Sequence, residues 1–297
     1  MFLAGLLALS SAVMYGFSHV FTRKSLAYVN AATATQFALV VNALLLWALS
    51  LSLVSEQVSY SPGVWVFVAD GAIVGTLARL FLYIGFDRVG VARAAPVSAS
   101  TPFFAVFFAV IFLHEVLTLP ILVGTVGIVF GIFVLSYGEA HKDWRRRDLL
   151  FPLASAVIWG VASNARKWGF SLGVEPLFGS AVASVTSAVI FPLFCLLKRE
   201  WNFKLTRSAI PFLVPAGILN GCALVLVFYA LKFGSVVLVS PLASSYPLFS
   251  VGLAFLFIPG MERVTSRVVA GMILIIIGAG LVLSGQTILD FLKQILS

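Results

Sequence analysis

Charge is scarce in this chain: Asp, Glu, Lys and Arg make up only 10% of its 297 residues, whereas 61% are hydrophobic. A water-soluble domain usually carries about 25% charged residues, which cover its surface. The mean hydropathy of +1.09 agrees with this imbalance. The composition therefore excludes an ordinary soluble protein and predicts an integral membrane protein whose apolar surface faces lipid.

Cysteine and histidine are equally sparse. Cys195 and Cys222 both lie in apolar stretches, where a free thiol behaves as a small hydrophobic side chain. The three histidines, His19, His114 and His141, fall in different segments of the chain. Because neither the spacing of metal ligands nor a nucleophile with its base is present, we expect no metal site, no catalytic residue, no cofactor and no enzymatic activity.

Alternation of polar and apolar residues is also missing, which excludes a transmembrane barrel. The apolar runs are instead long enough for helices of about 21 residues, and ten of them fit into the chain with short connections. The first run is followed, not preceded, by basic residues, so we interpret it as a permanent helix and not as a secretory signal. The predicted spans are 2–22, 32–54, 64–86, 92–113, 119–137, 149–168, 176–197, 210–231, 236–258 and 268–289.

One charged segment, residues 138–148, divides the ten spans into two sets of five. We interpret it as a solvated loop, which gives a first unit of residues 1–138, a linker of residues 139–148 and a second unit of residues 149–297. The net charge of +8 comes from basic residues at helix ends. Such residues anchor and orient membrane spans, so we do not expect binding to nucleic acid.

The two units resemble each other in sequence. Because each holds five helices, an odd number, the second unit is predicted to enter the membrane with the opposite orientation, as an inverted repeat. The fold class expected is an all-α integral membrane protein with ten transmembrane helices in two inverted five-helix repeats. The matching landmarks are Ser11–Gly16 with Ser155–Gly160 at an offset of 144, Ser100–Phe104 with Ser245–Phe249 at 145, and Gly124 and Gly131 with Gly271 and Gly278 at 147.

These landmarks resemble the EamA-type transporters of the drug/metabolite transporter superfamily. Each repeat opens with an aromatic-Gly pair, Tyr15-Gly16 and Trp159-Gly160, and each ends its fourth helix at an acidic residue before a Gly-rich fifth helix. The resemblance implies a secondary transporter with a central cavity lined mainly by the first, third, fourth, sixth, eighth and ninth helices. It leaves the substrate open, because the superfamily includes exporters of amino acids and other metabolites beside carriers of sugar phosphates and nucleotide sugars.

Arg79 is the charged residue that lies deepest in a predicted span. An unpaired charge at the centre of a membrane helix costs at least about 2.5 kcal/mol, so an anion is expected to offset it. Asp70 is nine residues away on nearly the opposite helix face and is a poor partner. A guanidinium in the cavity suits a carboxylate or a phosphate, whereas pairing with a neighbouring helix is the alternative. Thr76 and Tyr83 flank it at helical spacing.

Two polar stripes occupy equivalent positions in the repeats. The first helix repeats Ser11, Tyr15 and His19 every fourth residue, and the sixth repeats Ser155, Trp159 and Ser163. We expect the inverted repeat to bring these faces together. Helix packing explains the serines at least as well, because small polar residues favour close contact between membrane helices.

Proline pairs around small polar residues mark the fourth and ninth spans, in segments 95–102 and 239–247. Proline removes a helical hydrogen bond, so kinks beside a cavity are predicted there, although purely structural kinks are an equal alternative. Glycines in the fifth and tenth spans predict close packing or a dimer surface. Glu115 and Glu262 lie at span ends, where capping of the next helix is expected.

The leading hypothesis is a secondary transporter of an amino acid or another carboxylate-bearing metabolite, working by alternating access in the inner cell membrane. The alternatives are a sugar-phosphate or nucleotide-sugar exchanger, which should need more interior cations than Arg79, and a scaffold without transport. Expected partners are the substrate, the lipid bilayer, a coupling proton at His19, and, in a dimer, a second copy. The candidate substrate-binding residues are Tyr15, His19, Thr76, Arg79, Tyr83, Ser98, Thr101, Trp159, Ser163, Asn220, Ser244 and Tyr246.

The basic residues also bear on orientation. The odd-numbered connections and their helix edges hold fourteen Lys and Arg residues, whereas the even-numbered ones hold Arg166, Lys167 and Lys232. The positive-inside rule then predicts odd connections in the cytoplasm and both termini outside. The family resemblance implies cytoplasmic termini instead, and labelling of tagged termini in sealed cells separates the two.

Overall fold

The computed structural model describes residues 2–53, 61–89, 94, 97–136, 145–197, 203–257 and 266–296. The regular structure of these residues is helical. Eight stretches are long and apolar enough to cross a membrane, and two shorter apolar helices, Thr101–Phe112 and Leu119–Leu135, accompany them. This arrangement confirms the predicted all-α membrane architecture.

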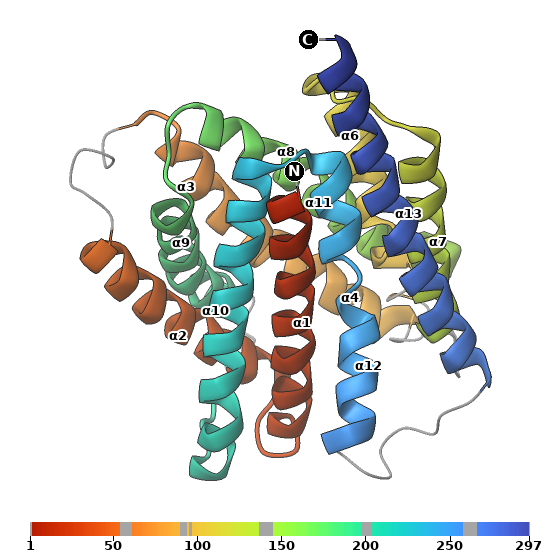
Figure 1. Cartoon of the computed structure of the whole chain (residues 1–297). Helices are drawn as coiled ribbons and strands as arrows, with labels where there is room; N and C mark the ends of the chain where they lie inside the picture. Colours follow the sequence, from red (N-terminus) through yellow and green to blue (C-terminus); the bar gives the residue numbers. More distant parts are fainter. Residues whose placement is uncertain are drawn as a thin grey trace.

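The helices form one bundle in which α1 begins and α13 ends at the same end of the molecule (Figure 1). An even number of membrane spans returns the chain to the side on which it began, so both of these helix ends must lie on the same side. The helices of the first half are α1 (Phe2–Ser25), α2 (Ala31–Leu53), α3 (Val64–Ala72), α4 (Arg79–Val89), α6 (Thr101–Phe112) and α7 (Leu119–Ser136). Those of the second half are α8 (Leu150–Ser171), α9 (Pro176–Leu197), α10 (Ile210–Phe233), α11 (Val236–Ala243), α12 (Tyr246–Phe257) and α13 (Ser266–Leu296).

The third span contains a π-helical turn, Ile73–Ala78, between α3 and α4. Gly71 and Gly75 lie on the side of this segment that faces α9, and a Cβ atom on Gly75 would come within 2.6 Å of the Ser187 Cβ. Ser187 in turn donates hydrogen bonds to the carbonyl oxygens of Gly71 (3.0 Å) and Ala183 (2.8 Å). The absence of side chains at the two glycines therefore allows α9 to contact the irregular backbone.

The ninth span is broken rather than kinked, which corrects the simple proline kink that the sequence suggested. Helix α11 ends at Ala243 and α12 begins at Tyr246, and Pro241 lies inside α11. The Ser245 hydroxyl donates a 2.6 Å hydrogen bond to the Leu242 carbonyl, so a side chain satisfies part of the interrupted backbone.

Equivalent helices of the two halves make the same contact with exchanged partners. Gly16 in α1 packs on Phe249 in α12, where a Cβ atom on the glycine would lie 2.7 Å from the phenylalanine Cβ. Gly160 in α8 packs on Phe104 in α6 in the same way, at 2.6 Å. The sequence offsets relate these two pairs to each other, so the contact between the opening helix of one repeat and the fourth helix of the other occurs twice.

The fifth helices of the repeats, α7 and α13, cross through glycines. Gly124 lies against Gly278 and Gly131 lies against Gly271, so residue numbers rise along one helix as they fall along the other. The two helices are therefore antiparallel, which is the geometry that an inverted repeat requires. These four glycines are buried inside the molecule, where they allow the close contact between helices that the sequence predicted.

Gly124→Val is expected to destabilise the protein by about 1–3 kcal/mol, because the new side chain overpacks the crossing of α7 and α13. A Cβ atom there would lie 2.8 Å from the Val282 Cγ2 atom. Gly280→Ala is the matched control, since a Cβ atom on Gly280 meets nothing within 4 Å. Equilibrium unfolding in mixed micelles should show a loss for the first variant and no loss for the second, and equal stabilities would contradict the close crossing.

Candidate functional site

Three ring side chains from two helices meet near the middle of the chain's opening helix. His19 in α1 lies 4.8 Å from Tyr246 in α12, measured between ring centroids, and Tyr15 lies 6.3 Å from Tyr246 and 6.4 Å from His19. His19 is exposed, whereas both tyrosines are half-buried. We call Tyr15, His19 and Tyr246, together with Arg79, the central cluster.

Arg79 completes the central cluster from the first turn of α4. Its side chain is half-buried, and its positive charge acts on both Tyr15 and His19. Within the described ranges of the chain, the guanidinium has no hydrogen-bond or ion-pair partner. The structure thus brings together four of the residues selected from the sequence, and Asp70 is not the partner of Arg79, as expected from its helix face.

Asp70 pairs instead with Arg166, which the sequence analysis counted among the basic residues at the even-numbered connections and their helix edges. The Arg166 Nε atom lies 2.9 Å from Asp70 Oδ1, and Nη2 lies 3.1 Å from Oδ2, so the pair is bidentate. Both residues are buried, with relative exposures of 5% and 8%. Arg166 is not at a helix edge, because α8 continues beyond the predicted end at residue 168 to Ser171, which places Arg166 more than one turn inside the helix. The expectation of a single interior cation was wrong for the same reason.

Two aromatic rings surround the Arg166 guanidinium. Its Cζ atom lies 5.0 Å from the centre of the Phe228 ring and 5.6 Å from that of Trp159. An aromatic face stabilises a desolvated cation, so these rings support a charge that the low dielectric would otherwise disfavour. Trp159, a predicted substrate contact, therefore has a definite role beside Arg166. The charges of Arg166 and Asp70 also act on Tyr15 of the central cluster.

The remaining candidates are less closely connected. Thr76 is buried in the π-helical turn, and its hydroxyl lacks a hydrogen-bond partner in the described structure. Asn220 accepts a 2.8 Å hydrogen bond from Asn42 in α2, a residue that the sequence interpretation did not select. Ser163 and Thr101 donate to carbonyls of their own segments, those of Trp159 and Ser98. Ser244 is half-buried at the α11–α12 break, and the side chain of Tyr83 lies outside the described structure.

The helices that carry the two polar stripes, α1 and α8, pack mainly on other helices and not on each other. Helix α1 packs mainly on α10 and α12, and α8 packs mainly on α6 and the α3–α4 segment. Ser11 donates a 2.9 Å hydrogen bond to the Ala223 carbonyl of α10, so its role is in packing. Its equivalent, Ser155, is buried and has no partner within the described residues. The segment that α8 contacts contains a π-helical turn, Ile73–Ala78, whereas α10, which α1 contacts, is α-helical throughout.

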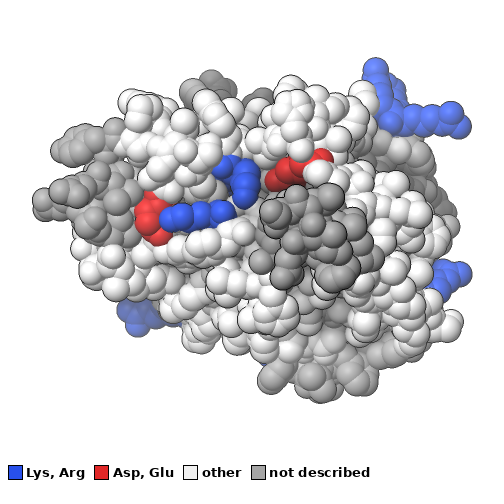
Figure 2. Space-filling model, turned by 45° about the horizontal axis from the view of Figure 1, so that its top comes forward, with Lys and Arg blue, Asp and Glu red and all other residues white. Residues whose placement is uncertain are grey.

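A second group of polar contacts closes the end of the bundle at which α1 begins and α13 ends. Glu115 accepts hydrogen bonds of 2.9 Å from the amides of Val236 and Val237, the first two residues of α11. Lys167 donates to the carbonyl oxygens of Leu231 and Gly234 at the end of α10. Figure 2 shows acidic and basic groups next to each other on this end of an otherwise weakly charged surface.

Glu115 thus caps a helix, as expected, but not the next helix in sequence. It belongs to the segment between α6 and α7 and caps α11 of the second repeat. Residues 236–242 of α11 are buried throughout, so the capped helix fills this end of the bundle. Glu262, the equivalent residue of the second repeat, lies outside the described residues. Among the described residues, no three His, Cys, Asp or Glu side chains gather in a way that could hold a metal ion.

Comparison with known proteins agrees with this architecture. A solved crystal structure superposes on the chain with a TM-score of 0.81, covering 96% of this chain and 98% of that one at 21% identity, which supports the fold. An uncharacterized transporter of Archaeoglobus fulgidus is 25% identical over 293 residues, which are 94% of this chain and 97% of that protein.

A curated relative with a printed activity is phosphoenolpyruvate/phosphate translocator 2, chloroplastic, of Arabidopsis thaliana. It is 26% identical over 198 residues, or 64% of this chain, and the match spans only about half, 49%, of that protein's length. The model of the EamA-like transporter family matches residues 2–137 and 147–284, one match for each half of the bundle. This multi-pass membrane protein therefore belongs to the EamA-like transporter family.

Proposed function

We propose that this chain transports a small organic compound with a carboxylate group, such as an amino acid or an organic acid, by alternating access. The observation that carries the proposal is Arg79, whose half-buried guanidinium has no partner among the described residues and lies beside Tyr15 and His19. A cation in a membrane span requires an offsetting anion. A carboxylate meets that requirement and binds a guanidinium in bidentate geometry.

The rings of the central cluster suit the body of such a substrate. His19 remains exposed although Tyr15 and Tyr246 lie against it, so a small molecule can reach its imidazole. Aromatic walls with a few polar groups are typical of sites for small metabolites. Coupling to a proton through His19 is part of the proposal, since imidazole is the side chain that most readily changes charge near neutral pH.

The local charge favours a single carboxylate group over a phosphate ester. Arg79 and Arg166 contribute two positive charges beside Tyr15, and Asp70 neutralises one of them through its bidentate pair with Arg166. One positive charge remains, which matches a single carboxylate. A phosphate-ester substrate is the second candidate, because the Arabidopsis relative carries phosphoenolpyruvate in its name and Arg166 is a second interior cation.

Alternating access is supported by the exchanged contacts of the two halves. The contact of Gly16 with Phe249 and that of Gly160 with Phe104 pair opposite repeats in the same way, and α7 and α13 are antiparallel. Two similar halves in opposite orientation can exchange their conformations, which opens the site first to one side and then to the other. We place the protein in the inner cell membrane, as a monomer or a homodimer.

Arg79→Gln is expected to abolish stabilisation by the substrate. A carboxylate ligand at about ten times its Kd should stabilise the purified wild-type protein by roughly 1.4 kcal/mol, which thermal unfolding detects. The panel contains amino acids, organic acids, sugar phosphates and amines. Arg207→Gln, which removes an exposed arginine at the start of α10, is the control and should keep the full shift.

The panel separates the candidates. Stabilisation by sugar phosphates but not by carboxylates would favour a phosphate ester over a carboxylate as the substrate class. Stabilisation by amines or neutral compounds that persists in Arg79→Gln would overturn the anion site and leave transport of another substrate class. Uptake of the stabilising compound into proteoliposomes, lost in Arg79→Gln and retained in Arg207→Gln, then tests transport itself.

A further inference from the structure

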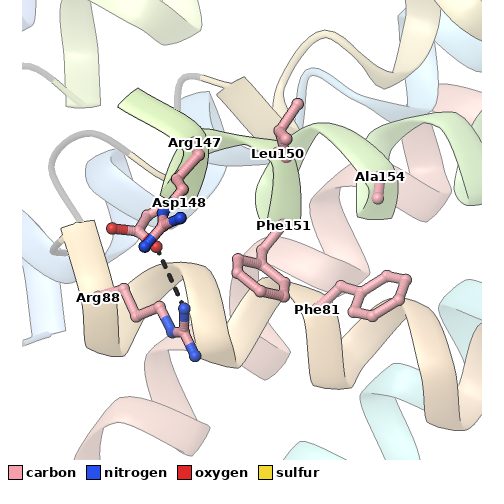
Figure 3. Close-up of a pocket in the computed structure, with 7 residues that line it drawn as sticks. All are labelled: Phe81, Arg88, Arg147, Asp148, Leu150, Phe151 and Ala154. Atoms are coloured by element: carbon pink, nitrogen blue, oxygen red, sulfur yellow. Dashed lines mark hydrogen bonds and ion pairs between the residues drawn. The ribbon is translucent and has the colours of Figure 1, made fainter. Parts of the chain in front are cut away.

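A pocket of 440 Å³ lies between the end of α4 and the start of α8. It is separate from the central cluster, since its wall contains none of those four residues. Figure 3 shows the Arg88 and Arg147 side chains near the Asp148 carboxylate at one end, and the Phe81 and Phe151 rings farther along the helices. The Arg88 guanidinium lies over the Phe151 ring, with its Cζ atom 4.8 Å from the ring centre. The pocket therefore has charged groups at one end, and its aromatic wall begins beside Arg88 at Phe151 and continues to Phe81.

The charged end is held in place by hydrogen bonds within the chain. Arg88 donates from Nη1 to Asp148 Oδ1 at 3.2 Å, and the Arg145 amide donates to Asp148 Oδ2 at 3.0 Å. Both oxygens of Asp148, the one carboxylate among the described residues of the pocket wall, are thus engaged. The Arg88 guanidinium has five N–H donors and half of its side chain is exposed, so further donors are available to a ligand. Arg147, exposed beside the same carboxylate, leaves a net positive charge.

The aromatic wall extends deeper into the apolar part of the helices. Phe81 precedes Arg88 by seven residues, which corresponds to two helical turns or about 10 Å along α4. Its ring lies 6.1 Å from that of Phe151 in α8, and Leu150 beside it is exposed. Cationic groups at a helix end, followed by rings toward the middle of the span, match the order of headgroup and acyl chain in a bilayer.

The equivalent position in the other half of the molecule, between the end of α10 and the start of α1, is closely packed and leaves no room for a ligand. The repeat offset of 144 relates Asp148 to Ala4 and Phe151 to Leu7, both in α1. Ala4 is fully buried against Gly234 at the end of α10, where a Cβ atom on the glycine would lie 2.5 Å from the alanine Cβ. The pocket is therefore specific to the α4–α8 pair and does not follow from the architecture of the repeat.

We propose that this pocket binds an anionic glycerophospholipid, with the phosphate on Arg88 and Arg147 and an acyl chain along Phe81 and Phe151. A soluble phosphate compound shares the headgroup chemistry, but it has no acyl chain that would contact the Phe81 and Phe151 rings. The site is independent of the transported substrate, because Arg79 lies outside it.

The test measures lipid retention by the full chain, purified in a neutral detergent, using native mass spectrometry. Dioleoyl phosphatidylglycerol is the anionic probe, and dioleoyl phosphatidylcholine is the zwitterionic comparison. We expect the wild type to retain phosphatidylglycerol at least tenfold better than phosphatidylcholine. Arg147→Gln should remove most of this preference while keeping the Arg88–Asp148 pair, and the double variant Arg88→Gln/Arg147→Gln should abolish it.

Control variants and soluble probes define the results that would overturn the proposal. Arg207→Gln, which replaces an exposed arginine at another helix end, should retain phosphatidylglycerol as the wild type does. Phe81→Ala should weaken retention without removing the headgroup preference. Equal retention by the wild type and the double arginine variant would overturn the site. Displacement of the lipid by millimolar inorganic phosphate or glycerol 3-phosphate would overturn the acyl-chain half and leave a site for soluble phosphate.

Discussion

Asp70→Asn is expected to lower the free energy of unfolding by about 3–5 kcal/mol, because it leaves the Arg166 charge buried without its partner. Both side chains are at most 8% exposed, and both guanidinium hydrogen bonds end on the Asp70 carboxylate. Phe228 and Trp159 support the cation but cannot replace an anion. Equilibrium unfolding in mixed micelles measures the loss.

Two further variants separate the ion pair from general damage to the core. Asp70→Leu combined with Arg166→Met removes both charges and should recover most of the stability, since an apolar pair of similar volume often equals a buried ion pair. Arg88→Gln breaks the Arg88–Asp148 pair, whose arginine is half-exposed, and should have a much smaller effect. If Asp70→Asn were as stable as the wild type, the pair would have to be solvated.

Glu115→Gln is expected to lower the population of this conformation, relative to the one with which it exchanges, by about 100-fold. The carboxylate accepts two hydrogen bonds from the first amides of α11, and hydrogen bonds to a charged group contribute about 1.5–3 kcal/mol each. Glutamine retains one acceptor and turns an NH2 donor toward the other amide. A loss of about 3 kcal/mol in one of two exchanging states changes their ratio by roughly two orders of magnitude.

Reaction of an introduced cysteine measures this shift. Ser240 in α11 is 7% exposed, so Ser240→Cys, in a chain without Cys195 and Cys222, should react slowly with a membrane-impermeant maleimide. Glu115→Gln should accelerate that reaction from the side on which α11 closes the bundle. Glu175→Gln is the matched control, because Glu175 caps α9 within its own repeat through the Phe178 amide. Equal acceleration by both variants would count against a specific role of Glu115.

Much of the architecture follows from local patterns in the chain. Apolar run lengths predict ten membrane spans, and the glycines of the fifth and tenth spans predict close helix contact, which the structure places at the crossing of α7 and α13. The periodicity of the first span also selected Tyr15 and His19, and the proline-flanked segment 239–247 selected Tyr246; these three rings meet in the structure. These features are predictable because a membrane helix must satisfy its own backbone, which leaves a strong signal over about 20 residues.

The contacts between the repeats could not be predicted in this way. Arg166 lies between Asn164 and Lys167 in a segment that resembles the polar end of a span, whereas α8 continues to Ser171 and so places Arg166 more than one turn inside the helix. Its partner Asp70 is 96 residues earlier. The capping of α11 by Glu115 likewise joins residues 121 and 122 positions apart. The available signal was the charge itself: Asp70 is also deep in an apolar span and required a partner of opposite sign.

The crossing of α7 and α13 has a consequence for the origin of the chain. Because equivalent glycines meet on both sides, the contact is isologous: the same surface patch is used twice, as in a two-fold symmetric dimer. A chain ending after α7 already carries this complete self-complementary patch. Two such five-helix chains, inserted into the membrane in opposite directions, could form the crossing without a covalent connection. The present molecule thus has the form of a fused dimer, and co-expression of its two halves as separate chains should reassemble it.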